Sequence, residues 1–436
     1  MSIAVHAAGF VHVGIALWHY ARPAAAGGAA ALGLGAIVRA PKRARSAVAV
    51  RERALAGLRV EVVRTHLDLA RHAAAWDDLA LAAPQQLPML AYPWVASYLE
   101  HRLAPSETWL CILAYREGQL IGVLPVVIDP HPLLGRWQPR LRAPAGLHTR
   151  SGQALLRVGQ EAPALSALLA ALEREVPGYV GLEMRGVREG SPLLAALARD
   201  LPGMVVEREL DGYGSFIRLS GTYRDYQAGL GPKMRNNLRR AGKRLAQLPG
   251  ADLEFLAGAA ATERDLPRFM ALEAAGWKGR RGTALAQDPA LVAFYTALTH
   301  RLAARGWLEW HFLTAEEQTI AGHLAVRFGR ALVMPKIAYD EAYAQCAPGN
   351  VLFERVVERA FASGDVDEIN QTSDMPWHRN WRMEQAAYYN VWLFPRRPTA
   401  LLCGAWPTSA HLRARRRLRP LARRARRRWR QHRAAS

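Results

Sequence analysis

The sequence predicts an α/β fold of the α+β type, with two similar units that each hold a mixed, mostly antiparallel sheet flanked by helices. With 436 residues, the chain is long enough for two domains. The segment 115–123, YREGQLIGV, is echoed at 314–323, TAEEQTIAGH, and both lie at an acidic turn after an apolar strand. We therefore predict a duplication. A chance match between two hairpin turns is the alternative.

Four parts follow from this division: a flexible N-terminal extension over 1–57, a first unit over 58–205, a second unit over 206–395 and an Arg-rich tail over 396–436. The apolar runs of the extension are shorter than the about twenty residues that a bilayer span needs, and the charged start of a signal peptide is missing. A membrane segment or a wrongly assigned start are the alternatives for residues 1–40.

In the first unit, periodicity and turn residues predict helices, strands and one hairpin. These are a strand at 60–63, helices at 67–81 and 88–103, a hairpin of strands 109–115 and 120–128, a helix at 162–175 and a strand at 179–184. In the second unit we expect helices at 266–277 and 289–305, strands at 308–314, 319–328 and 330–339, a helix at 349–363 and a strand at 366–372.

The stretch 331–364 organises the second unit. A short apolar strand leads to Pro348 and Gly349, and an amphipathic helix then runs to Gly364. Proline suits the first turn of a helix, and the free N–H groups of such a turn favour phosphate. An ordinary strand–loop–helix without a ligand is the alternative.

Charge and cysteine content limit the partners. The chain carries 58 Lys and Arg against 37 Asp and Glu, and twelve of the arginines fall in 410–436, which holds no acid. Such a tail could contact a polyanion or an anionic membrane surface non-specifically; a codon bias is the alternative, and no specific nucleic acid is expected. Three distant cysteines without metal-ligand spacing indicate a reducing compartment and no metal site. We expect a cytoplasmic protein, with the periphery of the inner membrane as an alternative.

Five short motifs in order carry a family resemblance: Trp277-Lys278-Gly279, Ile320-Ala321, Lys336-x-x-Tyr339-Asp340, Ala347-Pro348-Gly349 and Trp377-x-x-x-Trp381. Over about 210–395 the chain resembles the BioF2-like/CelD family of GNAT proteins, which is distantly related to the Fem aminoacyltransferases. The resemblance implies two GNAT-like units and acyl transfer from acetyl-CoA or another acyl-CoA to an amine, such as a sugar or cell-envelope intermediate. A Fem-like enzyme that uses aminoacyl-tRNA and a GNAT-shaped binding protein without turnover are the alternatives.

The resemblance also implies a cofactor site at the start of the 349–363 helix. Backbone groups of Gly349, Asn350 and Val351 would hold the pyrophosphate, and Tyr339 would flank the pantetheine arm between splayed strands. The chain departs from the usual GNAT pattern, because Gln345 lies four residues before Gly349 and Asn350-Val351 replaces the small-residue ending.

Candidate catalytic residues each have a structural alternative. His323 could accept an amine proton near neutral pH or be a buried core histidine. Lys336 and Asp340 share a strand face and could orient substrate and lower the barrier electrostatically or form an ion pair with each other. Glu273 could be a base or the polar side of its helix.

Substrate contacts are expected at Trp277, Lys278, Asp374 and Trp381, from the motifs of the resemblance. No tyrosine follows the 366–372 strand until Tyr388, so the acid that protonates the leaving thiolate stays open. A basic helix at 233–244, KMRNNLRRAGKR, places like charges four residues apart, where they repel. Either an anion binds there or the helix has a solvated basic face.

Overall fold

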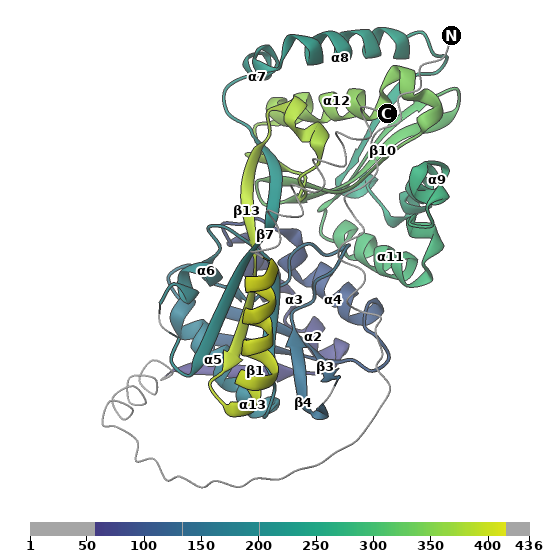
Figure 1. The fold of residues 1–436 in the computed structure, drawn as a ribbon. Coiled ribbons are helices and arrows are strands. Elements are labelled where there is room, and N and C mark those ends of the chain that lie inside the picture. Colours follow the sequence, from purple (N-terminus) through teal and green to yellow (C-terminus); the bar gives the residue numbers. More distant parts are fainter. Residues whose placement is uncertain (1–56, 133, 200, 416–436) are drawn as a thin grey trace, which may run out of the picture. The chain divides into compact units, whose positions relative to one another are not determined.

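A computed structural model describes residues 57–132, 134–199 and 201–415, all within one compact unit that spans 49–436 (Figure 1). The helices are α2 (His66–Ala70), α3 (Ala73–Leu81), α4 (Tyr92–His101), α5 (Glu161–Glu175), α6 (Pro192–Leu197), α7 (Tyr223–Gly229), α8 (Pro232–Leu245), α9 (Leu266–Ala275), α10 (Trp277–Arg280), α11 (Pro289–Ala303), α12 (Pro348–Ser363) and α13 (Pro398–Ala400). Two 3₁₀ segments matter below, η6 (Glu341–Cys346) and η7 (Pro376–Trp381). In these described ranges, no helix combines the length and hydropathy needed to cross a membrane.

The strands form one mixed sheet. They are β1 (Leu58–Val63), β2 (Thr108–Arg116), β3 (Gln119–His131), β4 (Gly135–Arg142), β5 (Leu155–Leu156), β6 (Gly181–Arg188), β7 (Met204–Arg218), β8 (Asp252–Ala257), β9 (Leu308–Ala315), β10 (Gln318–Phe328), β11 (Ala331–Tyr339), β12 (Glu368–Asn370) and β13 (Glu384–Pro395). Their order is β1-β2-β3-β4-β6-β13-β7-β12-β11-β10-β9-β8, and β5 pairs with β3.

This order contains the same pattern twice. We call β1-β2-β3-β4-β6-β13 the first half-sheet and β8-β9-β10-β11-β12-β7 the second. Each is an antiparallel run of four strands, followed by one parallel pair (β4 with β6, β11 with β12) and one antiparallel closing strand. The predicted hairpins, now β2–β3 and β9–β10, occupy equivalent positions in the two half-sheets. The mixed α/β fold with repeated units is therefore confirmed.

The closing strands join the half-sheets. β7 pairs with β12 on one side and with β13 on the other, and β13 also pairs with β6. Thus β7 precedes the other strands of its half-sheet in the chain, and β13 closes the first half-sheet from the far end of the sequence. The predicted boundary near 205 falls at the start of β7; the division into separate domains stays a prediction.

The two parallel pairs differ in what lies beyond them. β11 pairs with β12 only from Ala331 to Val333, after which β11 continues to Tyr339 beside β10. In the first half-sheet, the corresponding gap between β4 and β6 is occupied by residues 144–153, and Gly152 forms a bridge to Arg185 of β6. A Cβ at Gly152 would lie 2.1 Å from the Pro144 carbonyl oxygen, so this packing requires glycine.

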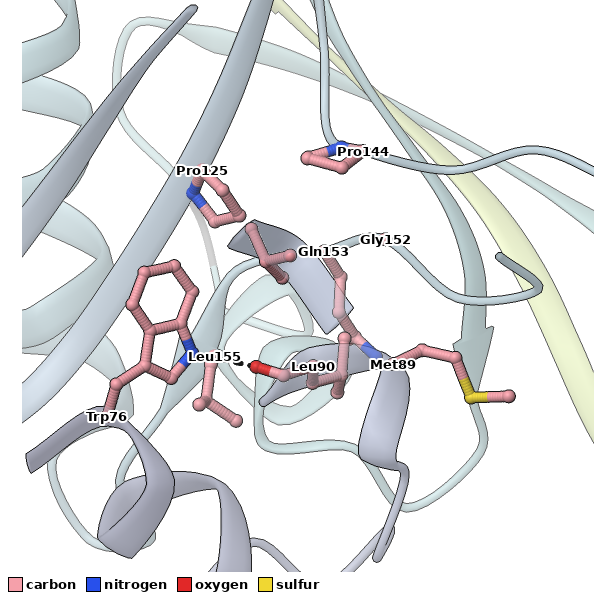
Figure 2. Close-up of a pocket in the computed structure, with 9 residues that line it drawn as sticks. Trp76, Met89, Leu90, Pro125, Pro144, Gly152, Gln153 and Leu155 are labelled. Carbon is pink, nitrogen blue, oxygen red and sulfur yellow. Dashed lines mark hydrogen bonds between the residues drawn. The ribbon is translucent and has the colours of Figure 1, made fainter. Parts of the chain in front are cut away.

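Figure 2 shows the small cavity that this filling segment leaves beside Trp76 and Gln153. Its volume is about 10 Å³, which is near the smallest space that holds one water molecule. The first half-sheet therefore has a closed gap, whereas the second has an open strand edge at 334–339.

Three predicted helices are broken in the structure. The helix expected at 88–103 is divided at Ala91, which is extended (φ −81°, ψ 160°), into a 3₁₀ turn over Pro88–Leu90 and helix α4. The helix expected at 67–81 is interrupted at His72, which has non-helical dihedral angles. The helix expected at 266–277 ends at Ala275, because Gly276 is extended (φ −82°, ψ −168°), and α10 then restarts at Trp277. The break at Gly276 positions the site described below.

Candidate functional site

Glu273 is the centre of a cluster of charged side chains. It lies on α9 with a side chain that is 0% exposed. Its Oε1 accepts hydrogen bonds from Lys278 Nζ at 2.6 Å and Lys336 Nζ at 3.5 Å, and its Oε2 accepts one from the backbone N–H of Leu285 at 2.8 Å. Both carboxylate oxygens are therefore engaged, as a buried charge requires.

The break at Gly276 brings Lys278 to Glu273. In a continuous helix, residues five apart point in different directions, so the extended residue is what turns Lys278 back. A Cβ at Gly279 would lie 1.8 Å from the Ala274 carbonyl oxygen, which explains the glycine in this tight restart. Lys278 Nζ also donates to the Ile337 carbonyl at 3.2 Å, which ties α10 to β11.

Lys336 lies on β11, directly after Pro335 and within the open edge at 334–339. Its side chain is 12% exposed, and its ammonium lies 5.6 Å from the centre of the Tyr295 ring. Burial lowers the pKa of Lys336 to about 8, against the opposing effect of Glu273. Burial alone would raise the pKa of Glu273, but Lys336 and Lys278 hold it below its usual value.

A loop of the first half-sheet completes the cluster. His148 belongs to the segment that fills the gap beside β4, and its Nδ1 lies 3.2 Å from the hydroxyl of Tyr295 on α11. Burial and the nearby Lys336 and Arg102 lower the pKa of His148 to about 3, so its imidazole is neutral at physiological pH. Two lysines thus share one carboxylate, next to a neutral histidine.

The start of α12 differs from the expected phosphate cradle in one respect. The N–H groups of Asn350 and Val351 both donate to the Ala347 carbonyl, at 2.9 and 3.1 Å. Of the three predicted donors, Gly349 is the one whose backbone N–H does not take part in this bonding. Its backbone is outside the left-handed region, and a Cβ there would meet Tyr339 Cδ1 at 3.5 Å, an ordinary contact.

Asp340 has a local structural role. Its Oδ1 accepts a hydrogen bond from the Ala342 N–H at 2.9 Å and so caps η6. Lys336 forms its ion pair with Glu273 and not with Asp340, which removes the alternative of a Lys336–Asp340 pair. Trp277 and Tyr339, each 43% exposed, lie on the chain beside Lys278 and Asp340 and offer aromatic surface there.

The other predicted site residues lie outside the cluster. His323 is 2% exposed, packs against His311 and Phe353, and has a pKa well below its usual value because of burial. It pairs with Ile337 across the strands, whereas Leu324 pairs with Lys336, so the two side chains lie on opposite faces of the sheet. The functional roles of His323 and Lys336 stay predictions.

Trp381 and Asp374 lie on the α12 side of the fold. The Trp381 ring is 1% exposed and meets Phe353 edge-on with 4.7 Å between ring centres. Asp374 accepts a hydrogen bond from Ser215 at 3.4 Å. Substrate contact by either residue stays a prediction, and the buried position of Trp381 agrees with a core role. Among the described residues, no group of three or more metal-binding side chains comes together.

Residues 232–371 match the model of the acetyltransferase (GNAT) domain. This segment has a GNAT fold. No curated protein matches the chain. Among solved structures, FemX has a TM-score of 0.52 and 12% identity, and the similarity covers 76% of this chain and 96% of FemX. This likeness supports the fold alone.

Two further structures show weaker likeness. A tandem GNAT protein from the clavulanic acid biosynthesis pathway has a TM-score of 0.41 and 14% identity over 78% of this chain and 99% of that chain. A protein of unknown function from Bacteroides thetaiotaomicron has a TM-score of 0.43 and 14% identity over 77% of this chain and 100% of that chain.

In this GNAT fold, sequence reasoning missed His148 and Tyr295. Tyr295 fits the apolar period of α11, and His148 lies in a connection rich in Pro and Gly. Neither position carries a sequence signal for a site, because the pairing joins a loop residue to a helix residue 147 positions later in the chain.

Proposed function

We propose that the chain is an acyl-CoA-dependent N-acyltransferase that acts on an amine of a sugar or cell-envelope intermediate and is related to the BioF2-like/CelD enzymes. The observation that supports this most is the open edge of β11 at 334–339, next to the cluster of Glu273, Lys278 and Lys336. An unpaired strand edge has backbone donors and acceptors that an extended amide-containing arm can pair with.

The proposed reaction needs a group that removes a proton from the amine. The amine nitrogen attacks the thioester carbonyl carbon, the C–S bond breaks, and the products are an amide and CoA with its thiol protonated. Glu273 is poorly suited as a base because both of its oxygens are engaged and its pKa is low. His148 is a weak base because its pKa is about 3.

Lys336 fits the proton transfer better. Its pKa of about 8 leaves an appreciable neutral fraction at physiological pH, and general bases work best when their pKa is near the working pH. We assign Lys336 as the proton acceptor, with Glu273 and Lys278 as positioning residues. Acyl-CoA would bind with its pyrophosphate near Gly349 and its pantetheine arm beside Tyr339.

The test has two stages. Calorimetric titration should show binding of acetyl-CoA, and release of free thiol should then be followed with a panel of amino sugars. Lys336→Met should abolish turnover while the affinity for CoA stays within about twofold. Lys336→Arg is the matched variant: an arginine keeps the charge but does not release its proton, so it should also be inactive.

Activity in Lys336→Arg would show that the charge, and not proton transfer, matters at this position. Absence of CoA binding by the parent protein would overturn the proposed donor. In that event aminoacyl-tRNA, the donor expected of a Fem-like enzyme, is the second candidate, which the FemX-like fold and the basic helix α8 favour. A binding protein without turnover would bind CoA and release no thiol.

A further inference from the structure

Helix α8 carries an unusual concentration of positive charge. It holds six basic residues and no acid over 14 residues. They are Lys233, Arg235, Arg239, Arg240, Lys243 and Arg244. In the part of the chain that the structure describes, none of the six forms an ion pair with Asp or Glu. Arg268, Arg280 and Arg355, by contrast, each pair with a glutamate. This basic face is not used by the mechanism proposed above.

The carboxy-terminal part of α8 packs on the first turn of α12, as Figure 1 indicates for the two helices. Ala241 and Leu245 are buried in one apolar cluster with Val351 and Leu352 of that turn. This packing fixes the carboxy-terminal part of α8 close to the start of α12.

Arg244 links the carboxy-terminal end of α8 to the connection that leads into α12. Its Nη1 donates to the Gln345 carbonyl at 2.8 Å, two residues before Ala347, the N-cap residue of α12. Arg240 lies one helical turn earlier on the same face of α8, so the two guanidinium groups repel each other. An anion bound between them would relieve that repulsion.

Asp340 and Glu341, the two acids of the connection between β11 and α12, already have partners. Asp340 accepts from the Ala342 N–H, and Glu341 pairs with Arg280 of α10. They therefore leave Arg240 and Arg244 available for a ligand. Arginine suits phosphate because its planar group donates two parallel hydrogen bonds.

We propose that Arg240 and Arg244 bind the 3′-phosphate of CoA, so that α8 recognises the nucleotide end of the cofactor. This inference rests on the proposed function, because the pyrophosphate must lie near Gly349. The 3′-phosphate is the other strongly anionic group of CoA. Arg244 contacts the connection into the same helix turn, and Arg240 lies one helical turn from Arg244 on the same face of α8. Lys243 adds positive charge at this end, whereas Lys233 lies at the opposite end of α8.

The experiment compares CoA with dephospho-CoA, which lacks only the 3′-phosphate. Affinities are measured by calorimetry for the parent protein, for Arg240→Gln/Arg244→Gln and for Lys233→Gln, with circular dichroism as the fold check. Glutamine is a good helix former. The parent should bind CoA about tenfold more tightly than dephospho-CoA, as expected for a charge-assisted hydrogen bond at an exposed site.

In the double variant, the affinity for CoA should fall to that for dephospho-CoA, while the affinity for dephospho-CoA itself stays the same. Lys233→Gln should behave like the parent. Equal affinity of the parent for both ligands would overturn this inference and leave the proposed function intact. An equal effect of Lys233→Gln would also overturn it, because it would indicate a diffuse polyanion surface. Binding of neither ligand would instead count against the proposed function.

Discussion

Arg188 and Glu368 form a bidentate ion pair between the two half-sheets, with Nη1–Oε1 and Nη2–Oε2 distances of 2.9 and 2.7 Å. Arg188 lies on β6 and Glu368 on β12, and β13 and β7 stand between these strands in the sheet order. The guanidinium also packs 5.2 Å from the centre of the Phe216 ring. With side-chain exposures of only 10% and 16%, the pair is shielded from water.

Arg188→Met should therefore destabilise the protein by about 3 kcal/mol, because it leaves a poorly solvated carboxylate without its partner. Urea unfolding measures this free energy. The double variant Arg188→Met/Glu368→Leu should lose less than the sum of the two single changes. Additive losses would show that the two charges do not depend on each other.

Glu273→Gln should cost about 3 kcal/mol of unfolding free energy, since Lys278 and Lys336 would then share no counterion. Glu384→Gln is the matched control, because Glu384 is 52% exposed in its pair with Arg218, and such pairs contribute less than about 1 kcal/mol. The comparison is made by urea unfolding at one pH. Similar losses in both variants would contradict the buried role of Glu273.

Lys336 should give stability a distinctive pH dependence. Its pKa is about 8 in the folded protein against 10.5 for an ordinary lysine, so the folded state is penalised below pH 8. Between pH 8 and 10.5 the unfolded chain binds more protons at this group than the folded protein does, and the free energy of unfolding rises with pH. Relative to Lys336→Met, the parent should gain about 2–3 kcal/mol from pH 7 to 10.

Lys336→Met is the reference for the parent protein in this measurement, because the other titrating groups are common to both proteins. Parallel stability curves for the parent and Lys336→Met would mean that the ammonium keeps an ordinary pKa. That result would also remove the basis for Lys336 as a proton acceptor near neutral pH.

Gly349→Val should weaken acyl-CoA binding by about 1–3 kcal/mol, comparable to the loss of one or two charge-assisted hydrogen bonds. The branched side chain would crowd the first turn of α12 against Tyr339, whereas the single methyl of Gly349→Ala fits at 3.5 Å. Calorimetric titration with CoA compares the two variants. If a folded Gly349→Val binds like the parent, the phosphate site is elsewhere.

The sequence predicted α12 and the β9–β10 hairpin well, because hydrophobic periodicity and turn residues are local signals. It also selected Glu273, Lys278 and Lys336, but it did not predict how they meet. The predicted helix at 266–277 contained Glu273 and ended just before Lys278, and the extended conformation of Gly276 is what allows the two side chains to pair. Glycine at 276 and 279 was the available signal for that break.

His148 could not be predicted from local patterns, because its contact with Tyr295 depends on how the gap beside β4 is filled. The strand β13 was missed as well, although Val391 and Leu393 are buried. Pairing between segments so distant in sequence depends on the whole topology. The predicted tail over 396–436 is described only to Arg415, which pairs with Glu209 at 2.9 Å, and residues 416–436 and 1–56 lie outside the described residues.

The positions of β7 and β13 in the chain have a consequence for biosynthesis. β6 is paired with β13, which ends at Pro395, so the first half-sheet stays incomplete until residue 395 has left the ribosome. The second half-sheet, by contrast, has all of its strands once residue 370 has emerged. Although proteins commonly fold their N-terminal parts first during synthesis, here the later-made half can close before the earlier one. A chain interrupted after residue 383 would expose an unpaired edge on β6 and β7, and such edges promote aggregation.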